Sequence, residues 1–239
     1  MTHSDEMRID IVPNGPYMVR GSVPLLRVKI VVEDGDSVAF KETHRYPLQE
    51  QYALCRCGAS KNKPYCDGMH EAIDFDGRRV APYANYWSEA ETYRGDDITL
   101  FDAPRFCIGA RFCDRAGGVW NLTEDQDNKE SEKLAIEEAE LCPSGRLTMV
   151  NDRTKAAYEI DYEPSIAIIE DPYGGASSAV WVRGGIPVFD ENGDQLELRN
   201  RVTLCRCGKS RDIPYCDGTH YQIRFDDGVL EDEDEMEVG

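Results

Sequence analysis

The pattern of apolar and polar positions along the chain predicts short β-strands and one clear helix. Residues 26–32, with the sequence LRVKIVV, alternate like a strand with one buried face. Residues 17–25 (YMVRGSVPL) and residues 180–188 (VWVRGGIPV) share a second pattern, which indicates two similar β-rich segments. Residues 129–141 have a helical period and predict an acidic amphipathic helix whose glutamates, including Glu138, face outward.

A cysteine-rich segment follows each of the two β-rich segments. Residues 54–70 read LCRCGASKNKPYCDGMH and residues 204–220 read LCRCGKSRDIPYCDGTH, with twelve of the seventeen positions identical. Each copy has the spacing C-x-C-x8-C-x3-H. A chance cluster would not recur with every spacing kept, so the repeat indicates two metal sites. The predicted ligands are Cys55, Cys57, Cys66 and His70 in the first copy and Cys205, Cys207, Cys216 and His220 in the second.

The spacing within each copy has a mechanical explanation. The cysteines of C-x-C lie two apart in an extended segment, so both sulfurs point the same way. Cys66 and His70 lie four apart, which places them on one face of a helical turn. Asp67 is suited to accept a main-chain N–H at the start of that turn. We expect the Ser60 hydroxyl to donate to a cysteine sulfur. The second copy offers the same groups at Asp217 and Ser210.

The residues alone leave the metal open, because three thiolates and one imidazole also suit a structural zinc ion. Both segments resemble the CDGSH iron-sulfur domain (NEET) family, whose motif runs C-x-C-x2-[ST]-x3-P-x-C-D-G-[SAT]-H. The second copy matches every position, and the first departs at Met69, where the family has a small residue. The resemblance implies a [2Fe-2S] cluster in each copy, with two cysteines on one iron and a cysteine and the histidine on the other.

The resemblance also implies an architecture. In NEET proteins with one motif per chain, two chains share strands in a β cap, and a chain with two repeats reproduces that pairing within itself. We therefore expect an α+β fold in a monomer, with two small β-rich CDGSH units that form an intrachain pseudodimer and flank a ferredoxin-like α+β domain. The expected boundaries are 1–80 and 161–228 for the CDGSH domains, 81–160 for the central domain and 229–239 for an acidic tail.

The remaining three of the nine cysteines, Cys107, Cys113 and Cys142, lie between the repeats. This segment resembles a single-cluster bacterial ferredoxin, in which a C-x2-C-x2-C loop is completed by a distant Cys-Pro. Ala110 stands at the middle cysteine position, so three thiolates remain. The resemblance implies a [3Fe-4S] cluster or a [4Fe-4S] cluster whose fourth iron takes a non-cysteine ligand. A ferredoxin-like fold that has lost its cluster is the alternative.

Composition limits the partners and the compartment. The net charge of −19 makes nucleic acid a poor partner. It suits a redox protein or reductase with a basic docking face, although solubility or growth in high salt would also explain it. The sequence has no apolar run near 18 residues and no secretory pattern, so we expect no membrane span. A reducing cytoplasm would keep the cysteines free to bind metal.

These features together predict an iron-sulfur cluster-binding protein that acts as an electron carrier. The alternative from another class is a cluster donor, which delivers [2Fe-2S] to an apo acceptor, or a redox or iron sensor. A catalytic role is the third reading. We expect no enzyme, because no nucleophile set or phosphate-binding glycine loop accompanies the cysteines.

Overall fold

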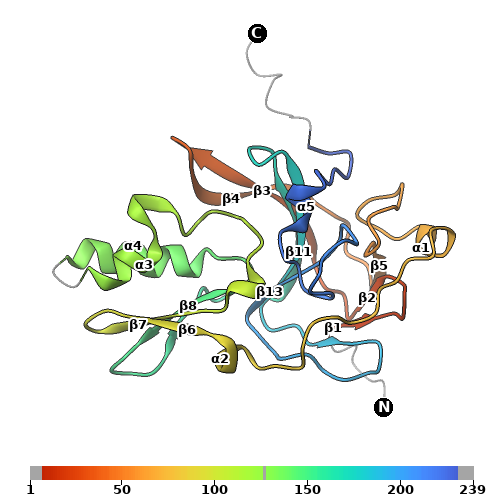
Figure 1. Ribbon diagram of the computed structural model, residues 1–239. Coiled ribbons are helices and arrows are strands. Elements are labelled where there is room, and N and C mark those ends of the chain that lie inside the picture. Colours follow the sequence, from red (N-terminus) through yellow and green to blue (C-terminus); the bar gives the residue numbers. More distant parts are fainter. Residues whose placement is uncertain (1–6, 126–127, 231–239) are drawn as a thin grey trace, which may run out of the picture.

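The computed structural model describes residues 7–125 and 128–230, so the predicted acidic tail lies outside the described residues from position 231 onward. Three β-sheets form the framework (Figure 1). The first has the strand order β12-β1-β2-β5, the second β13-β11-β10-β3-β4 and the third β6-β7-β8-β9. None of the described helices is long and apolar enough to cross a membrane.

The elements have the following bounds. The first sheet contains β1 (Arg8–Ile11), β2 (Tyr17–Arg20), β5 (Gln51–Leu54) and β12 (Val188–Phe189). The second contains β3 (Leu25–Glu33), β4 (Asp36–Arg45), β10 (Ser165–Asp171), β11 (Ala176–Arg183) and β13 (Arg201–Leu204). The third contains β6 (Glu91–Arg94), β7 (Ile98–Asp102), β8 (Leu147–Asn151) and β9 (Ala157–Tyr158). The helices are α1 (Met69–Ala72), α2 (Tyr86–Glu89), α3 (Val119–Glu124), α4 (Lys129–Glu140) and α5 (Thr219–Gln222), with 3-10 turns at Pro104–Phe106 and Arg115–Gly117.

The first two sheets each contain strands from both repeats. In the first sheet, β1 pairs in parallel with β12 of the second repeat, and Ile9 lies opposite Val188. In the second sheet, β10 pairs in parallel with β3 of the first repeat, and Ile166 lies opposite Leu25. The order β12-β1-β2-β5 therefore corresponds strand for strand to β3-β10-β11-β13. Each repeat contributes one strand to the other's sheet. Strand β4 has no counterpart in the second repeat; it lies between Gly21 and Cys55, a segment longer than the corresponding one between Gly184 and Cys205.

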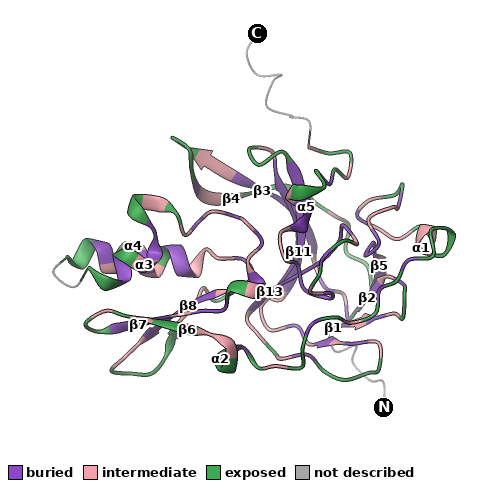
Figure 2. Ribbon diagram, in the orientation of Figure 1, coloured by how far each residue is buried: buried purple, intermediate pink, exposed green. Residues whose placement is uncertain are grey.

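The core of the molecule lies between these two sheets. Strands β10 and β11 are buried along almost their whole length, as Figure 2 shows for β11. Alternate residues of a strand face opposite sides, so each of these strands contributes to two clusters. Ile166 and Val180 face the first sheet, whereas Ala167 and Trp181 face the segment that carries Cys107 and Cys113. The second sheet is therefore covered on both faces.

The central segment is built from the third sheet and helices α3 and α4. Apolar residues of both helices, among them Val119 and Ala135, pack on residues of β7 and β8 such as Met149. The predicted helix at 129–141 is confirmed as α4, which begins after Asn128, whose side chain accepts a hydrogen bond from the main-chain N–H of Glu130. The helix ends before Cys142 and Pro143, as a helix leading into proline must.

The prediction that Glu138 faces outward is wrong, because its side chain is fully buried. It lies on the helix face that also carries Ala135, whose small side chain leaves room for it. The guanidinium Nε of Arg115 lies 3.6 Å from Glu138 Oε1. Neither carboxylate oxygen has a hydrogen-bond partner within the described part of the chain. Burial raises the pKa of Glu138 to about 8.

This pKa predicts a pH-dependent stability. A pKa raised above the unfolded value means that stability is fully present below about pH 4.5 and falls as pH rises toward about 8. Glu138→Gln keeps the size and removes the charge, so the variant should be more stable than the parent at about pH 9 by at least about 1 kcal/mol. Denaturant unfolding at both ends of this range measures the difference. The control is Glu130→Gln, at an exposed position, which should leave the dependence of stability on pH unchanged. If Glu138→Gln had the same dependence as the parent, the raised pKa of Glu138 would be contradicted.

Candidate metal centres

Each C-x-C pair lies at the end of a strand of the first or second sheet. Cys55 follows β5, and its sulfur lies 3.9 Å from that of Cys57. Cys205 follows β13, and its sulfur lies 3.6 Å from that of Cys207. The extended backbone places residues i and i+2 on one side, so the structure confirms the expected convergence of the two sulfurs.

The third cysteine and the histidine of each copy form a second pair. The sulfur of Cys66 lies 3.3 Å from Nδ1 of His70, and the sulfur of Cys216 lies 3.3 Å from Nδ1 of His220. The cysteine precedes the helix and the histidine lies within it, as the second residue of α1 or α5. The two are joined through Gly68 or Gly218, which has a positive φ.

The predicted role of the aspartate is confirmed, and that of the serine is wrong. Asp67 Oδ1 accepts the N–H of Met69 at 3.1 Å, and its Oδ2 accepts the N–H of Lys61 at 2.8 Å. The Ser60 hydroxyl donates to the carbonyl of Tyr65 at 2.6 Å and not to a sulfur. The hydroxyl thereby closes the loop between Ser60 and Tyr65. The second copy repeats this with Ser210 and the carbonyl of Tyr215 at 2.7 Å.

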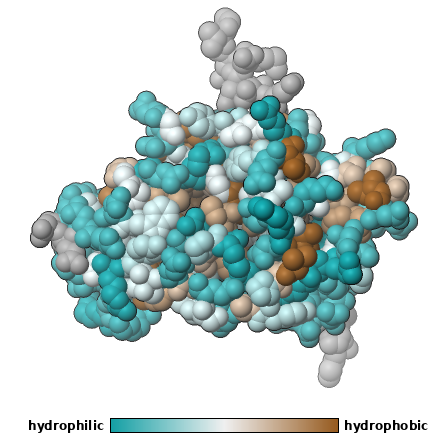
Figure 3. All heavy atoms as spheres, viewed as in Figure 1, coloured by the Kyte–Doolittle hydropathy of each residue, from teal (hydrophilic) through white to brown (hydrophobic). Residues whose placement is uncertain are grey.

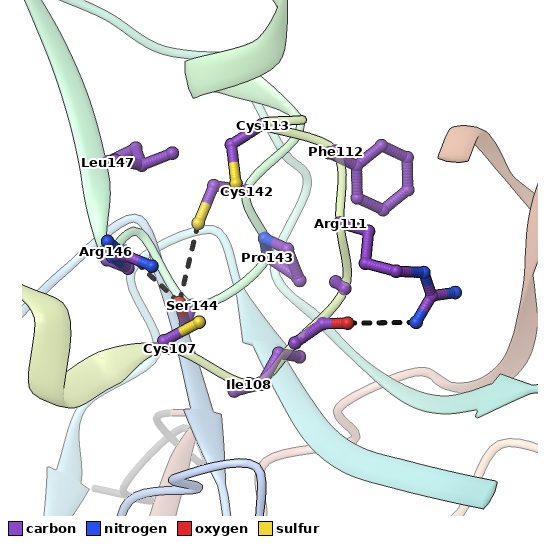
Figure 4. Close-up of a pocket in the computed structure, with 12 residues that line it drawn as sticks. Cys107, Ile108, Arg111, Phe112, Cys113, Cys142, Pro143, Ser144, Arg146 and Leu147 are labelled. Atoms are coloured by element: carbon purple, nitrogen blue, oxygen red, sulfur yellow. Dashed lines mark hydrogen bonds between the residues drawn. The ribbon is translucent and has the colours of Figure 1, made fainter. Parts of the chain in front are cut away.

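The three central cysteines border one cavity of about 30 Å³ (Figure 4). Cys107 and Cys113 come from the loop before α3, and Cys142 follows α4. The Cys142 sulfur lies 3.5 Å from the Ser144 hydroxyl, which also accepts the main-chain N–H of Arg146. The cavity has room for about two water molecules between the three cysteines.

Comparison with protein families agrees with this arrangement. The family described as iron-binding zinc finger CDGSH type matches residues 14–71 and 178–221. The family described as divergent 4Fe-4S mono-cluster matches residues 93–152. The chain therefore contains two CDGSH-type segments with a divergent 4Fe-4S ferredoxin-like segment between them. The matches support an iron-sulfur binding protein. No curated protein and no solved structure matches the chain.

The donor sets of these segments fit iron-sulfur clusters. A metal ion that binds two thiolates tetrahedrally at about 2.3 Å holds the sulfurs about 3.8 Å apart, close to the spacing in both C-x-C pairs. Among the described residues, no three His, Cys, Asp or Glu side chains are grouped around a single metal ion. The ligands of each CDGSH site are thus arranged as two pairs. At the central site, three sulfurs face one cavity, which is the donor set of a ferredoxin-type cluster.

The thiols of each C-x-C pair ionise unequally. A hydrogen bond from the Cys57 thiol lowers the pKa of Cys55 to about 6, and the main-chain N–H of Ser60 adds to this effect. The same bond raises the pKa of Cys57. In the second pair, Cys207 likewise lowers the pKa of Cys205 to about 7. The first thiol of each pair therefore loses its proton more readily than the second, and metal binding displaces the remaining proton.

The two CDGSH sites differ in their exposure to solvent. His220 is buried, its Nε2 lies 3.1 Å from the Ser178 hydroxyl, and burial lowers its pKa to about 4. The side chain of His70 is 16% exposed, and the nearest carboxylate oxygen, of Glu71, is 4.0 Å away. Cys66 is likewise partly exposed, whereas Cys216 is buried. The first site is open to water, and the second is closed.

Two buried arginines support the C-x-C turns, and the sequence reasoning did not assign them a role. Arg56, between Cys55 and Cys57, donates to the carbonyls of Gly15, Gly77 and Val12 at 2.7–3.0 Å. Its counterpart Arg206 donates to the carbonyls of Ser178 and Ile169 and also binds two carboxylates, since Nη2 lies 2.9 Å from Glu170 and Nη1 binds Asp227. Both copies have arginine between the two cysteines of C-x-C, and this repetition could have indicated a structural role.

The two C-x-C turns meet back to back. Cys57 and Cys207 form an isolated antiparallel bridge between the repeats. A Cβ on Gly58 would lie 2.4 Å from the Cys207 carbonyl oxygen, and a Cβ on Gly208 would lie 2.4 Å from that of Cys57. Both glycines also have a positive φ. Only glycine fits at these positions.

Gly208→Ala should therefore destabilise the protein by roughly 2–5 kcal/mol, from backbone strain and from overlap with a main-chain oxygen. Gly175→Ala is the matched control, because Gly175 has φ +66° but nothing within 4 Å of a Cβ. It should cost only about 1 kcal/mol. Chemical unfolding of both variants measures the difference. If both substitutions lowered the free energy of unfolding equally, the close contact between the two turns would not contribute to stability.

Proposed function

We propose that this protein is an electron carrier rather than an enzyme. Each CDGSH site would hold a [2Fe-2S] cluster, and Cys107, Cys113 and Cys142 would hold a third, ferredoxin-type cluster. The pairing of ligands carries this proposal. Each CDGSH site has two sulfurs 3.6–3.9 Å apart and a separate Cys–His pair at 3.3 Å. A two-iron cluster needs two such pairs, whereas a zinc ion needs all four ligands around one center.

When bound, such clusters supply one-electron transfer, and the residues around them set how they do so. The cysteines balance the iron charge as thiolates. The histidine is a neutral and weaker donor, which favours a higher potential than four thiolates give. Arg56 and Arg206 hold the C-x-C turns from behind, so the sulfurs keep their spacing.

The fold also supports an intrachain pseudodimer of the two repeats and therefore a monomeric protein. Each repeat contributes one parallel strand to the other's sheet, and the two C-x-C turns meet at a local two-fold relation between Cys57 and Cys207. A second chain is not needed to complete either sheet.

The surface supports a basic redox protein or reductase as the partner, rather than nucleic acid. The net charge is −19, and complementary charge speeds encounter. Hydrophilic residues cover most of the face in Figure 3, with hydrophobic residues in small separate groups. A partner would therefore dock mainly through polar contacts.

A cluster donor or redox sensor is the second candidate, and the first site favours it. Cys66 and His70 are partly exposed there, so an acceptor's thiols could reach this pair directly. The second site offers no such access, because Cys216 and His220 are buried. Under this alternative, the first site would deliver [2Fe-2S] and the second would retain it.

The difference in exposure predicts that acid removes the two clusters at different rates. Histidine binds iron only as the neutral ring, so protons compete with the metal, and they reach His70 more easily than His220. Between about pH 7 and about pH 5, visible absorption should decay in two phases, with the first site lost at least about tenfold faster. His70→Cys should abolish the fast phase, and His220→Cys should leave it intact. A single phase in the parent would contradict this.

Repeated redox cycling separates carrier from donor. A carrier should pass through many rounds of reduction and reoxidation with constant iron and sulfide content, because its ligands stay bound. Iron content per chain after cycling, with an apo acceptor present, is the measurement. The carrier proposal fails if [2Fe-2S] passes stoichiometrically to the acceptor faster than the protein is reduced.

The central cysteines should hold a third cluster, so the parent should contain about seven or eight irons per chain and Cys142→Ser about four. An oxidised [3Fe-4S] center gives a sharp EPR signal that oxidised [2Fe-2S] clusters do not give. Ser144→Ala is the control, because it keeps all three sulfurs. About four irons in the parent, unchanged by Cys142→Ser, would make the central segment a scaffold. Stoichiometric zinc in colorless protein would overturn the assignment of the outer sites.

A further inference from the structure

The loop of residues 107–113, which carries two of the central cysteines, packs directly on the second CDGSH site. We call it the central loop. Its residues Ile108, Ala110 and Phe112 share one apolar cluster with Cys216, a ligand of that site. A Cβ on Gly218 would lie 3.4 Å from the carbonyl oxygen of Cys107. The main chains of the two ligand-bearing loops therefore lie close together.

Tyr221 joins the central loop to the histidine ligand. Its ring lies against that of His220, with 4.3 Å between the ring centroids. On the other side the ring meets the central loop, since a Cβ on Gly109 would lie 2.8 Å from Tyr221 Cε2. The ring therefore fills the space between the loop and the ligand, and Gly109 has no side chain because there is no room for one.

An ion pair between partly exposed Arg111 and a buried carboxylate fixes this contact. Arg111 of the central loop binds Asp171 with both of its terminal nitrogens, at 2.9 and 3.0 Å, and Asp171 is fully buried at the end of β10. The Tyr221 hydroxyl donates to the same carboxylate. Arg111 also donates to the carbonyl of Gly109 at 3.1 Å (Figure 4). A bidentate, charge-assisted pair of this kind holds both position and orientation.

The first CDGSH site has no such cover. Glu71 stands at the position that corresponds to Tyr221, and its side chain is 86% exposed. Helix α1 has no buried residue, whereas α5 buries Thr219 and His220. The two nearly identical motifs thus have different surroundings, because the central loop and β11 both pack on the second site.

We propose that the central loop, held by Arg111 and Tyr221, controls how firmly the second CDGSH site retains its ligand group, while the first site is independent of it. The part that concerns bound clusters rests on the proposed function. Filling the central site ties Cys107, Cys113 and Cys142 to one group and so anchors the loop at both ends. An empty central site leaves the loop held only by Arg111 and its apolar contacts. Arg111 and Tyr221 are positioning residues and need not touch the iron.

The first test uses the apoprotein, so it does not depend on any cluster. Brief alkylation with iodoacetamide, followed by peptide mass spectrometry, reads Cys66 and Cys216 separately. Tyr221→Phe keeps the ring and removes the hydroxyl, and Arg111→Gln removes the ion pair. Both variants should alkylate Cys216 about tenfold faster than the parent and leave Cys66 unchanged. Arg111→Lys, which keeps a charge beside Asp171, should restore part of the protection.

The control is Glu71→Gln, the corresponding position in the first copy, which should change neither rate. Unchanged alkylation of Cys216 in both Tyr221→Phe and Arg111→Gln would overturn the proposal. An equal rise at Cys66 would also overturn it, because that result means general loosening of the fold.

The second test uses the loaded protein. Cys142→Ser, which cannot anchor the loop, should lose the cluster of the second site about tenfold faster than the parent, read as alkylation of Cys216 over time, with the rate at Cys66 unchanged. Equal rates for the parent and Cys142→Ser at Cys216 would refute the coupling to the central site. Protein isolated without iron would refute the proposed function, and the apoprotein test would still decide the role of Arg111 and Tyr221.

Discussion

The main-chain contact between the two C-x-C turns is the constraint on which the arrangement of sites depends. Cys57 and Cys207 face each other across the repeats, with a glycine after each cysteine and a carbonyl oxygen where a side chain would otherwise lie. No side chain fits between the two turns, so their main chains are held against each other. The buried arginines behind the turns then have a fixed backbone to bind. The junction thus helps to fix the backbone that sets the distance between the two sulfurs of each C-x-C pair.

Around this symmetric junction the two repeats have diverged. Arg56 binds only main-chain carbonyls, whereas Arg206 belongs to a buried network with Glu170 and Asp227. Both arginines are equally buried, so burial alone does not decide which partners they have. The central segment packs on Cys216 of the second copy, whereas Cys66 of the first copy is partly exposed. Two nearly identical motifs thus acquire different chemistry from what is packed on them.

The local features were readable from the sequence, and the long-range ones were not. The C-x-C convergence and the aspartate turn follow from residue spacing, and both were predicted. The Ser60 hydroxyl was assigned to a sulfur because the composition of the motif does not reveal that it donates to the carbonyl of Tyr65. Glu138 was placed outside because an acidic helix gives no sign of the arginine it meets. The packing of the central loop on Tyr221 joins residues 110 positions apart, and no periodicity encodes such a contact.

The exchange of strands has a consequence for the order in which the chain can fold during synthesis. Strand β1 cannot pair with β12 until some 175 further residues have been synthesised. At typical rates of translation this takes on the order of 10–35 s. Strand β3 waits for β10 in the same way. Until then the first repeat has an open sheet edge and reactive thiols without their mature surroundings. A nascent chain of this kind needs protection, and its metal centers belong to the last stage of its maturation.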